Sequence, residues 1–141
     1  MVFAATRDGR LHAVDARSGK TLWGVATGAD RALPWGHESG DLYLSSPTAS
    51  GDLVLFGSGD GRLYALDRRS GKERWRVETG GRIRSTPSIA NGRVFVGSGD
   101  GRLYCFDLER GTAIWRYDTE GRRSSRGSSG TTAGPCRAHR R

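Results

Sequence analysis

Short apolar runs separated by glycine-rich turns follow one another along most of this chain. In the second group the runs span residues 45–50, 53–58, 62–67 and 73–79, and in the third group residues 86–90, 93–98, 102–107 and 113–119. The runs are rich in β-branched and aromatic residues and are bounded by Gly, Asn, Asp and Ser, which is typical of β-strands. Because no segment shows a sustained apolar period of a helix, we predict an all-β fold.

Two-residue turn signals join the predicted strands in order. Gly51-Asp52 and Asn91-Gly92 are hairpin signals between first and second strands, and Asp60-Gly61 and Asp100-Gly101 lie between second and third strands. Asp8-Gly9 occupies the same place in an earlier group, which begins at its second strand. Four antiparallel strands in each of about three groups predict a partial β-propeller with four-stranded blades.

A long sequence repeat supports this division. The stretch Gly-Asp-Gly-Arg-Leu-Tyr at residues 59–64 returns forty residues later at 99–104, and a related Asp-Gly-Arg-Leu-His stands at residues 8–12. A fixed period near 40 residues is typical of repeat architectures. We predict blades at residues 2–29, 45–80 and 85–120, an insertion at 30–41 and a tail at 121–141, with propeller repeats over residues 1–120.

Each copy also carries an aspartate, a glycine and a tryptophan around the turn between its third and fourth strands. The sets are Asp15, Gly19 and Trp23; Asp67, Gly71 and Trp75; and Asp107, Gly111 and Trp115. The carboxylate is placed to accept N–H bonds from the turn, and the glycine allows a positive φ and leaves room for a flat ring. We predict that the tryptophans dock between neighbouring blades; three aromatic contacts to a ligand are the alternative.

The docking motif resembles that of a known family. Ala13-x-Asp15-x-x-Ser18-Gly19-Lys20-x-x-Trp23 and its copy from Ala65 to Trp75 are similar to the tryptophan-docking motif of pyrroloquinoline-quinone-type, or quinoprotein-like, propeller repeats. The third copy, from Cys105 to Trp115, keeps only the Asp, Gly and Trp. WD-type repeats share the period, but their Trp-Asp ending is missing here, and kelch repeats are longer.

One end of the predicted sheets is a candidate partner-binding face. In an antiparallel blade the turns between second and third strands lie at the same end as the connections to the next blade, and loops on a rigid scaffold commonly carry binding residues. The residues that this argument brings together are Arg10, Arg62 and Arg102 from the turns, Arg82 and Arg84 from a connection, and Trp35 and His37 from the insertion. A solvated face with one tolerated insertion is the simpler alternative.

The positive charge is concentrated in the tail. The net charge is +8, and residues 121–141 contain six arginines and no acidic residue, which leaves +2 (8 minus 6) for residues 1–120. The tail is rich in Ser, Gly and Arg, so we expect it to be disordered. A basic tail can bind nucleic acid through phosphates, but we do not expect nucleic acid to be a partner.

The residues give little support for an enzyme. The resemblance implies that dehydrogenases of this family hold pyrroloquinoline quinone and a divalent metal on the propeller axis, often beside a vicinal cysteine pair. Here no cysteines are adjacent, and Cys105 stands where Ala13 and Ala65 stand in the other copies. The three histidines lack metal-ligand spacing. We therefore predict no catalytic residue, no cofactor and no metal site.

The leading functional hypothesis is a noncatalytic binding or scaffold module. The resemblance implies a piece of a longer propeller protein similar to outer-membrane assembly lipoproteins or sensor propellers, with a protein partner or self-association. The alternative is a piece of a dehydrogenase that uses pyrroloquinoline quinone with calcium. We expect no membrane span and no secretory signal in this chain. The localisation stays open, although members of this family are often periplasmic or extracytoplasmic.

Overall fold

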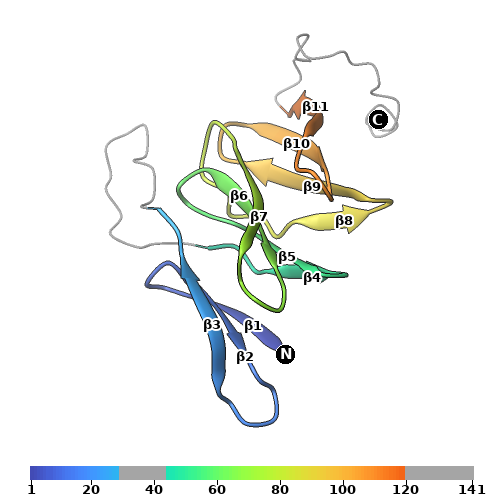
Figure 1. Cartoon of the computed structure of the whole chain (residues 1–141). Helices are drawn as coiled ribbons and strands as arrows, with labels where there is room; N and C mark the ends of the chain where they lie inside the picture. The colour runs from blue at the N-terminus through green and yellow to red at the C-terminus, as the bar shows by residue number, and fades with distance from the viewer. Residues whose placement is uncertain (29–43, 120–141) are drawn as a thin grey trace.

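The computed structural model describes residues 1–28 and 44–119, and within them it confirms the all-β prediction. Three antiparallel sheets follow one another along the chain (Figure 1). The first sheet consists of β1 (Val2–Thr6), β2 (Arg10–Val14) and β3 (Thr21–Ala26). The second consists of β4 (Thr48–Ser50), β5 (Leu53–Gly57), β6 (Arg62–Asp67) and β7 (Glu73–Glu78), and the third of β8 (Ser88–Ala90), β9 (Arg93–Ser98), β10 (Arg102–Asp107) and β11 (Ala113–Asp118).

Each sheet is a simple meander in which every strand pairs with the strand before it. The first sheet has three strands and begins at the position of β5 and β9, as the repeat predicts. The predicted insertion at 30–41 and tail at 121–141 lie outside the described residues.

The first strand of each complete sheet is shorter than predicted. β4 begins at Thr48 rather than residue 45, and β8 begins at Ser88 rather than residue 86. Pro47 and Pro87 directly precede these strands, and a proline has no N–H for the ladder. Ser45 still contacts β5, because its backbone N–H donates to the Gly57 carbonyl at 2.7 Å and its hydroxyl accepts the Gly57 N–H at 2.7 Å.

The hydrophobic core lies between the sheets. One cluster joins the first and second sheets and includes Leu11, Phe56 and Tyr64; the other joins the second and third sheets and includes Leu55 and Val96. Strand β5 is buried along its whole length because it has a neighbouring sheet on both sides. Its sequence is correspondingly an uninterrupted apolar run rather than an alternating one.

Glycines bring the connection between the second and third sheets against the third sheet. A Cβ atom on Gly81 would lie 2.5 Å from the Asp100 nitrogen and 2.7 Å from the Gly99 carbonyl carbon. Both neighbours are backbone atoms, which cannot turn aside as a side chain does. Gly81 therefore permits a close approach that another residue would prevent.

We expect Gly81→Ala to lower the free energy of unfolding by about 1–3 kcal/mol, since the added methyl group forces the two sheets apart. Urea denaturation monitored by tryptophan fluorescence measures this change. Gly97→Ala is the matched control, because its Cβ would meet only the Ser85 hydroxyl at 3.6 Å. Neither glycine has a positive φ. An equal loss in both variants would contradict the steric explanation.

Candidate functional site

The turn between the third and fourth strands of each copy is built around its aspartate. The Asp67 carboxylate accepts the backbone N–H groups of Arg69 and Ser70, both at 2.9 Å. These N–H bonds, that of Ser70 foremost, lower the pKa of Asp67. Asp15 and Asp107 make equivalent turn contacts. The turn glycine that follows has φ of 74–76° in the three copies, a conformation that favours glycine.

Two of the three tryptophans of the docking motif lie against the turn glycine of the next sheet. The Trp23 ring covers Gly71, whose added Cβ would lie 2.6 Å from ring carbon Cδ2, and the Trp75 ring covers Gly111 at an equivalent 2.5 Å. The Trp23 indole N–H donates to the Arg68 carbonyl at 3.1 Å. Trp75 donates in the same way to the carbonyl of the residue after Asp107, at 3.0 Å. The contact therefore joins the tryptophan face of one sheet, which carries its Trp, to the glycine face of the next sheet, which carries the receiving turn.

The third tryptophan differs from the other two. Trp115 lies beside Phe95 with ring centroids 5.9 Å apart, much as Trp23 lies beside Phe3 at 5.9 Å. Its Nε1 is shielded from solvent and has no hydrogen-bond acceptor among the described residues. Gly19, on the first sheet, has no heavy atom within 4 Å of an added Cβ.

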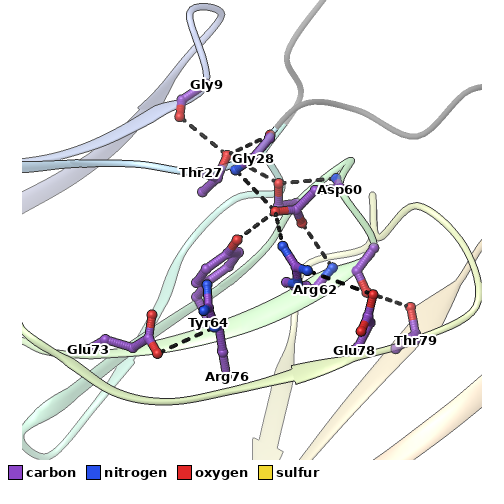
Figure 2. Close-up of polar contacts among 12 residues, drawn as sticks. Gly9, Thr27, Gly28, Asp60, Arg62, Tyr64, Glu73, Arg76, Glu78 and Thr79 are labelled. Atoms are coloured by element: carbon purple, nitrogen blue, oxygen red, sulfur yellow. Dashed lines mark hydrogen bonds and ion pairs between the residues drawn. The ribbon is translucent and has the colours of Figure 1, made fainter.

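A second link between the first two sheets is centred on a buried carboxylate (Figure 2). Asp60 is 6% exposed. One of its oxygens accepts the Gly28 N–H at 3.1 Å and the Tyr64 hydroxyl at 2.5 Å, and the other accepts the Arg62 N–H at 3.0 Å. The Arg62 guanidinium lies 3.8 Å from the carboxylate. Burial, and then the Asp60 carboxylate, raise the pKa of Tyr64.

The same link joins the second and third sheets. Asp100 accepts the Gly80 N–H at 3.0 Å, the Arg102 N–H at 3.0 Å and the Tyr104 hydroxyl. The first sheet lacks it, because His12 replaces the tyrosine and the Asp8 side chain is 62% exposed.

Sequence reasoning assigned Asp60 and Asp100 only to turns and missed their role between sheets. A usable signal was present. Side chains two residues apart lie on the same side of an extended chain. An Asp and a Tyr four residues apart, found in two copies, therefore indicate a contact between the carboxylate and the tyrosine hydroxyl.

The structure places the predicted partner-binding residues as follows. The turns beside Arg10, Arg62 and Arg102 lie at one end of their sheets. The residue that follows the last strand of a sheet donates a hydrogen bond to this turn, as the Thr79 N–H does to the Gly61 carbonyl at 2.8 Å. Arg10 and Arg84 are exposed, and Arg62 and Arg102 are half-buried beside aspartates. Trp35 and His37 lie outside the described residues.

Arg82 does not fit a surface role. Its side chain is 7% exposed, whereas the sequence placed it on the open face with Arg84. The backbone of Arg82 lies in the tight connection, where its carbonyl accepts the Gly99 N–H at 2.7 Å. The assignment of Arg82 to the partner-binding face stays a prediction, and the proposal below relies on the exposed Arg10 and Arg84 instead.

Two further properties concern residues 1–28 and 44–119 alone. No group of three or more His, Cys, Asp or Glu side chains there is arranged to hold a metal ion. The same residues include no helix with the length and apolar character needed to cross a membrane.

Known proteins share both the sequence pattern and the fold. The PQQ_2 family model, described as outer membrane protein assembly factor BamB, matches residues 7–134. A 1-butanol dehydrogenase (quinone) of Thauera butanivorans is 38% identical over 77 residues, which are 54% of this chain and 12% of the dehydrogenase. The outer membrane protein assembly factor BamB of Salmonella typhimurium is 32% identical over 77 residues, covering 55% of this chain and 19% of BamB.

A solved structure shows the likeness in three dimensions. The crystal structure of BamB from Moraxella catarrhalis matches with a TM-score of 0.64 and 30% identity over 81% of this chain. The match covers 32% of that BamB chain, so this chain spans about a third of such a propeller. The chain belongs to the quinoprotein-like repeat family described as outer membrane protein assembly factor BamB, and it forms part of a β-propeller.

Proposed function

We propose that this chain is a noncatalytic β-propeller module that binds a protein partner, in the manner of an assembly or scaffold factor. The main support is that the aspartates that recur in the repeats form contacts between sheets. The carboxylates of Asp60 and Asp100 are occupied by N–H and hydroxyl groups that tie one sheet to the next. These residues therefore serve the scaffold, and each of their carboxylate oxygens already accepts at least one hydrogen bond.

The exposed side chains at the turn end are the proposed contact surface. Arg10 is exposed beside the Asp8-Gly9 turn, and Arg84 is exposed in the connection between the second and third sheets. Guanidinium groups form strong paired hydrogen bonds with carboxylates. This end of the sheets is therefore best suited to bind a partner segment that carries acidic side chains.

Site-specific photo-crosslinking tests the proposal. A photoreactive residue in place of Arg84 is expected to give a discrete crosslinked product with a second protein in the native host. The same residue in place of Arg69 is the control, because Arg69 is also an exposed arginine but lies in the turn at the opposite end of its sheet. The double variant R10E/R84E, crosslinked from residue 102, is expected to lose the product. Equal products from residues 84 and 69, or none from residue 84, would contradict the proposal.

A quinone-dependent dehydrogenase is the second candidate, favoured by the 38% identity to 1-butanol dehydrogenase (quinone). Against this candidate, the repeated aspartates Asp60 and Asp100 already accept backbone N–H groups between the sheets. Titration with pyrroloquinoline quinone and calcium separates the candidates. Saturable binding with a dissociation constant of about 1 μM would favour the dehydrogenase and contradict a noncatalytic module.

A further inference from the structure

The hairpin turn between β8 and β9 carries the only asparagine of the sequence, Asn91, directly before Gly92. Both residues are exposed and have positive φ, 51° and 73°. A side-chain amide in this position can be attacked by the backbone nitrogen of the next residue, and glycine has no Cβ to obstruct the approach. The turn therefore has the chemistry for a spontaneous covalent modification.

Three Asp-Gly turns of the chain have related chemistry but are restrained by hydrogen bonds. The N–H groups of their glycines donate to backbone carbonyls at 3.0–3.1 Å; these glycines are Gly9, Gly61 and Gly101. The aspartate before each glycine also accepts a side-chain hydroxyl, from Thr6, Tyr64 and Tyr104 respectively. In these turns the backbone nitrogen and the carboxyl carbon approach each other only if such bonds break.

The Asn91-Gly92 turn has neither restraint. Within residues 1–28 and 44–119, no hydrogen bond is formed by the Asn91 amide or by the Gly92 N–H. The strand before the turn, β8, has three residues and lies at the edge of its sheet, next to β9 (Figure 1). The Asp-Gly turns of the second and third sheets instead join inner strands of five or six residues. Short edge segments open locally more easily than inner strands, so the Asn91 side chain reaches the geometry for attack while the sheets stay folded.

We propose that Asn91 is a deamidation site of the folded chain, with water as the co-reactant. The Gly92 backbone nitrogen loses its proton and bonds to Cγ of Asn91, while the bond from Cγ to the amide nitrogen breaks and ammonia leaves. Water then opens the cyclic succinimide. Attack on Cγ restores the normal peptide bond and gives aspartate, whereas attack on the backbone carbonyl carbon gives isoaspartate, in which the main chain runs through Cβ and Cγ. No electrons are gained or lost.

The isoaspartate product changes the contact between the second and third sheets. The Gly92 carbonyl accepts the Leu108 N–H at 3.0 Å, and the Leu108 carbonyl accepts the indole N–H of Trp75 at 3.0 Å. Isoaspartate adds a methylene group to the main chain at residue 91, which displaces the Gly92 carbonyl and weakens the docking of Trp75. This turn lies beside the docking turn and away from the arginine-bearing turns, so its test is independent of the proposed function.

Mass spectrometry of the full chain during storage in mildly alkaline buffer tests the modification. The sequence has no other side-chain amide, so the mass difference between amide and acid reports on Asn91 alone. We expect this gain, together with one heavy oxygen atom when the buffer is made with isotopically labelled water. Asn91→Gly is the matched control, because glycine tolerates the positive φ and has no amide.

Electron-transfer fragmentation of the digested chain locates isoaspartate. We expect it at residue 91 in the folded chain, and at Asp60 and Asp100 only after the chain has been unfolded in urea. An Asn91 amide that persists in the folded chain but is lost from the unfolded chain would overturn the proposal. Isoaspartate that forms equally fast at the three positions in the folded chain would also overturn it.

The effect on docking is tested with the isoaspartate-containing chain after chromatographic purification. Asn91→Asp is the matched control, since it carries the same added charge without the additional methylene group. We expect the isoaspartate chain to unfold at a lower urea concentration and to show a shifted Trp75 indole resonance by NMR. The Trp23 resonance is the internal reference, because its acceptor residue, Arg68, is bonded to Asp52 within the second sheet. Equal urea midpoints and an unmoved Trp75 resonance would overturn the link to docking.

Discussion

Replacing Trp75 with alanine is expected to lower the free energy of unfolding by about 3–5 kcal/mol, the range for removing a buried aromatic side chain. Trp75 is 9% exposed, covers Gly111 and donates its indole N–H to the Leu108 carbonyl at 3.0 Å. The substitution therefore removes apolar burial and a hydrogen bond from the contact between the second and third sheets. Urea denaturation followed by circular dichroism measures the loss.

Trp115→Ala is the matched control for Trp75→Ala. Both tryptophans occupy the same place in the repeat, but no described sheet follows Trp115. At concentrations where the chain is monomeric, we expect Trp115→Ala to destabilise the chain less. The difference between the variants isolates the contribution of docking from that of packing within a sheet. Equal losses would mean that the ring acts mainly through its own sheet.

The second large effect is expected from Asp60→Ala, which should lower the free energy of unfolding by about 1–3 kcal/mol for each buried donor that loses its acceptor. It leaves the Tyr64 hydroxyl, the Gly28 N–H and the Arg62 guanidinium without their shared acceptor. A buried polar group without a partner costs more than the net value of the bond it made. Urea denaturation measures the loss, and amide hydrogen exchange at Gly28 is expected to accelerate.

Asp8→Ala provides the control at the equivalent position of the first sheet. The Asp8 side chain is 62% exposed and holds only contacts within its own turn, such as the Thr6 hydroxyl. We expect a change within about 0.5 kcal/mol, as for most surface substitutions. If Asp8→Ala and Asp60→Ala were equally destabilising, the aspartate would act through its turn and not through the link between sheets.

The strands, the turns and the docking glycines were predictable from the sequence because local chemistry determines them. Alternating and continuous apolar runs identify strands, and Asn91-Gly92 supplies two residues with positive φ, 51° and 73°. Gly71 and Gly111 adopt the left-handed conformation that a turn after an aspartate favours. β4 and β8 begin later than the predicted runs, because Pro47 and Pro87 have no N–H to donate to the ladder.

Contacts between sheets were decided only by the tertiary structure. The sequence shows Asp60 beside a glycine, which indicates a turn, but not that Gly28, thirty-two residues earlier, donates to it. It shows Arg82 and Arg84 as two similar arginines, yet Arg82 is buried and Arg84 is exposed in the folded chain. It shows three tryptophans at equivalent repeat positions, of which two have a receiving sheet among the described residues and Trp115 does not. The physical reason is that strand pattern and turn conformation depend on neighbouring residues, whereas burial and the pairing of a polar atom depend on which sheet packs against it.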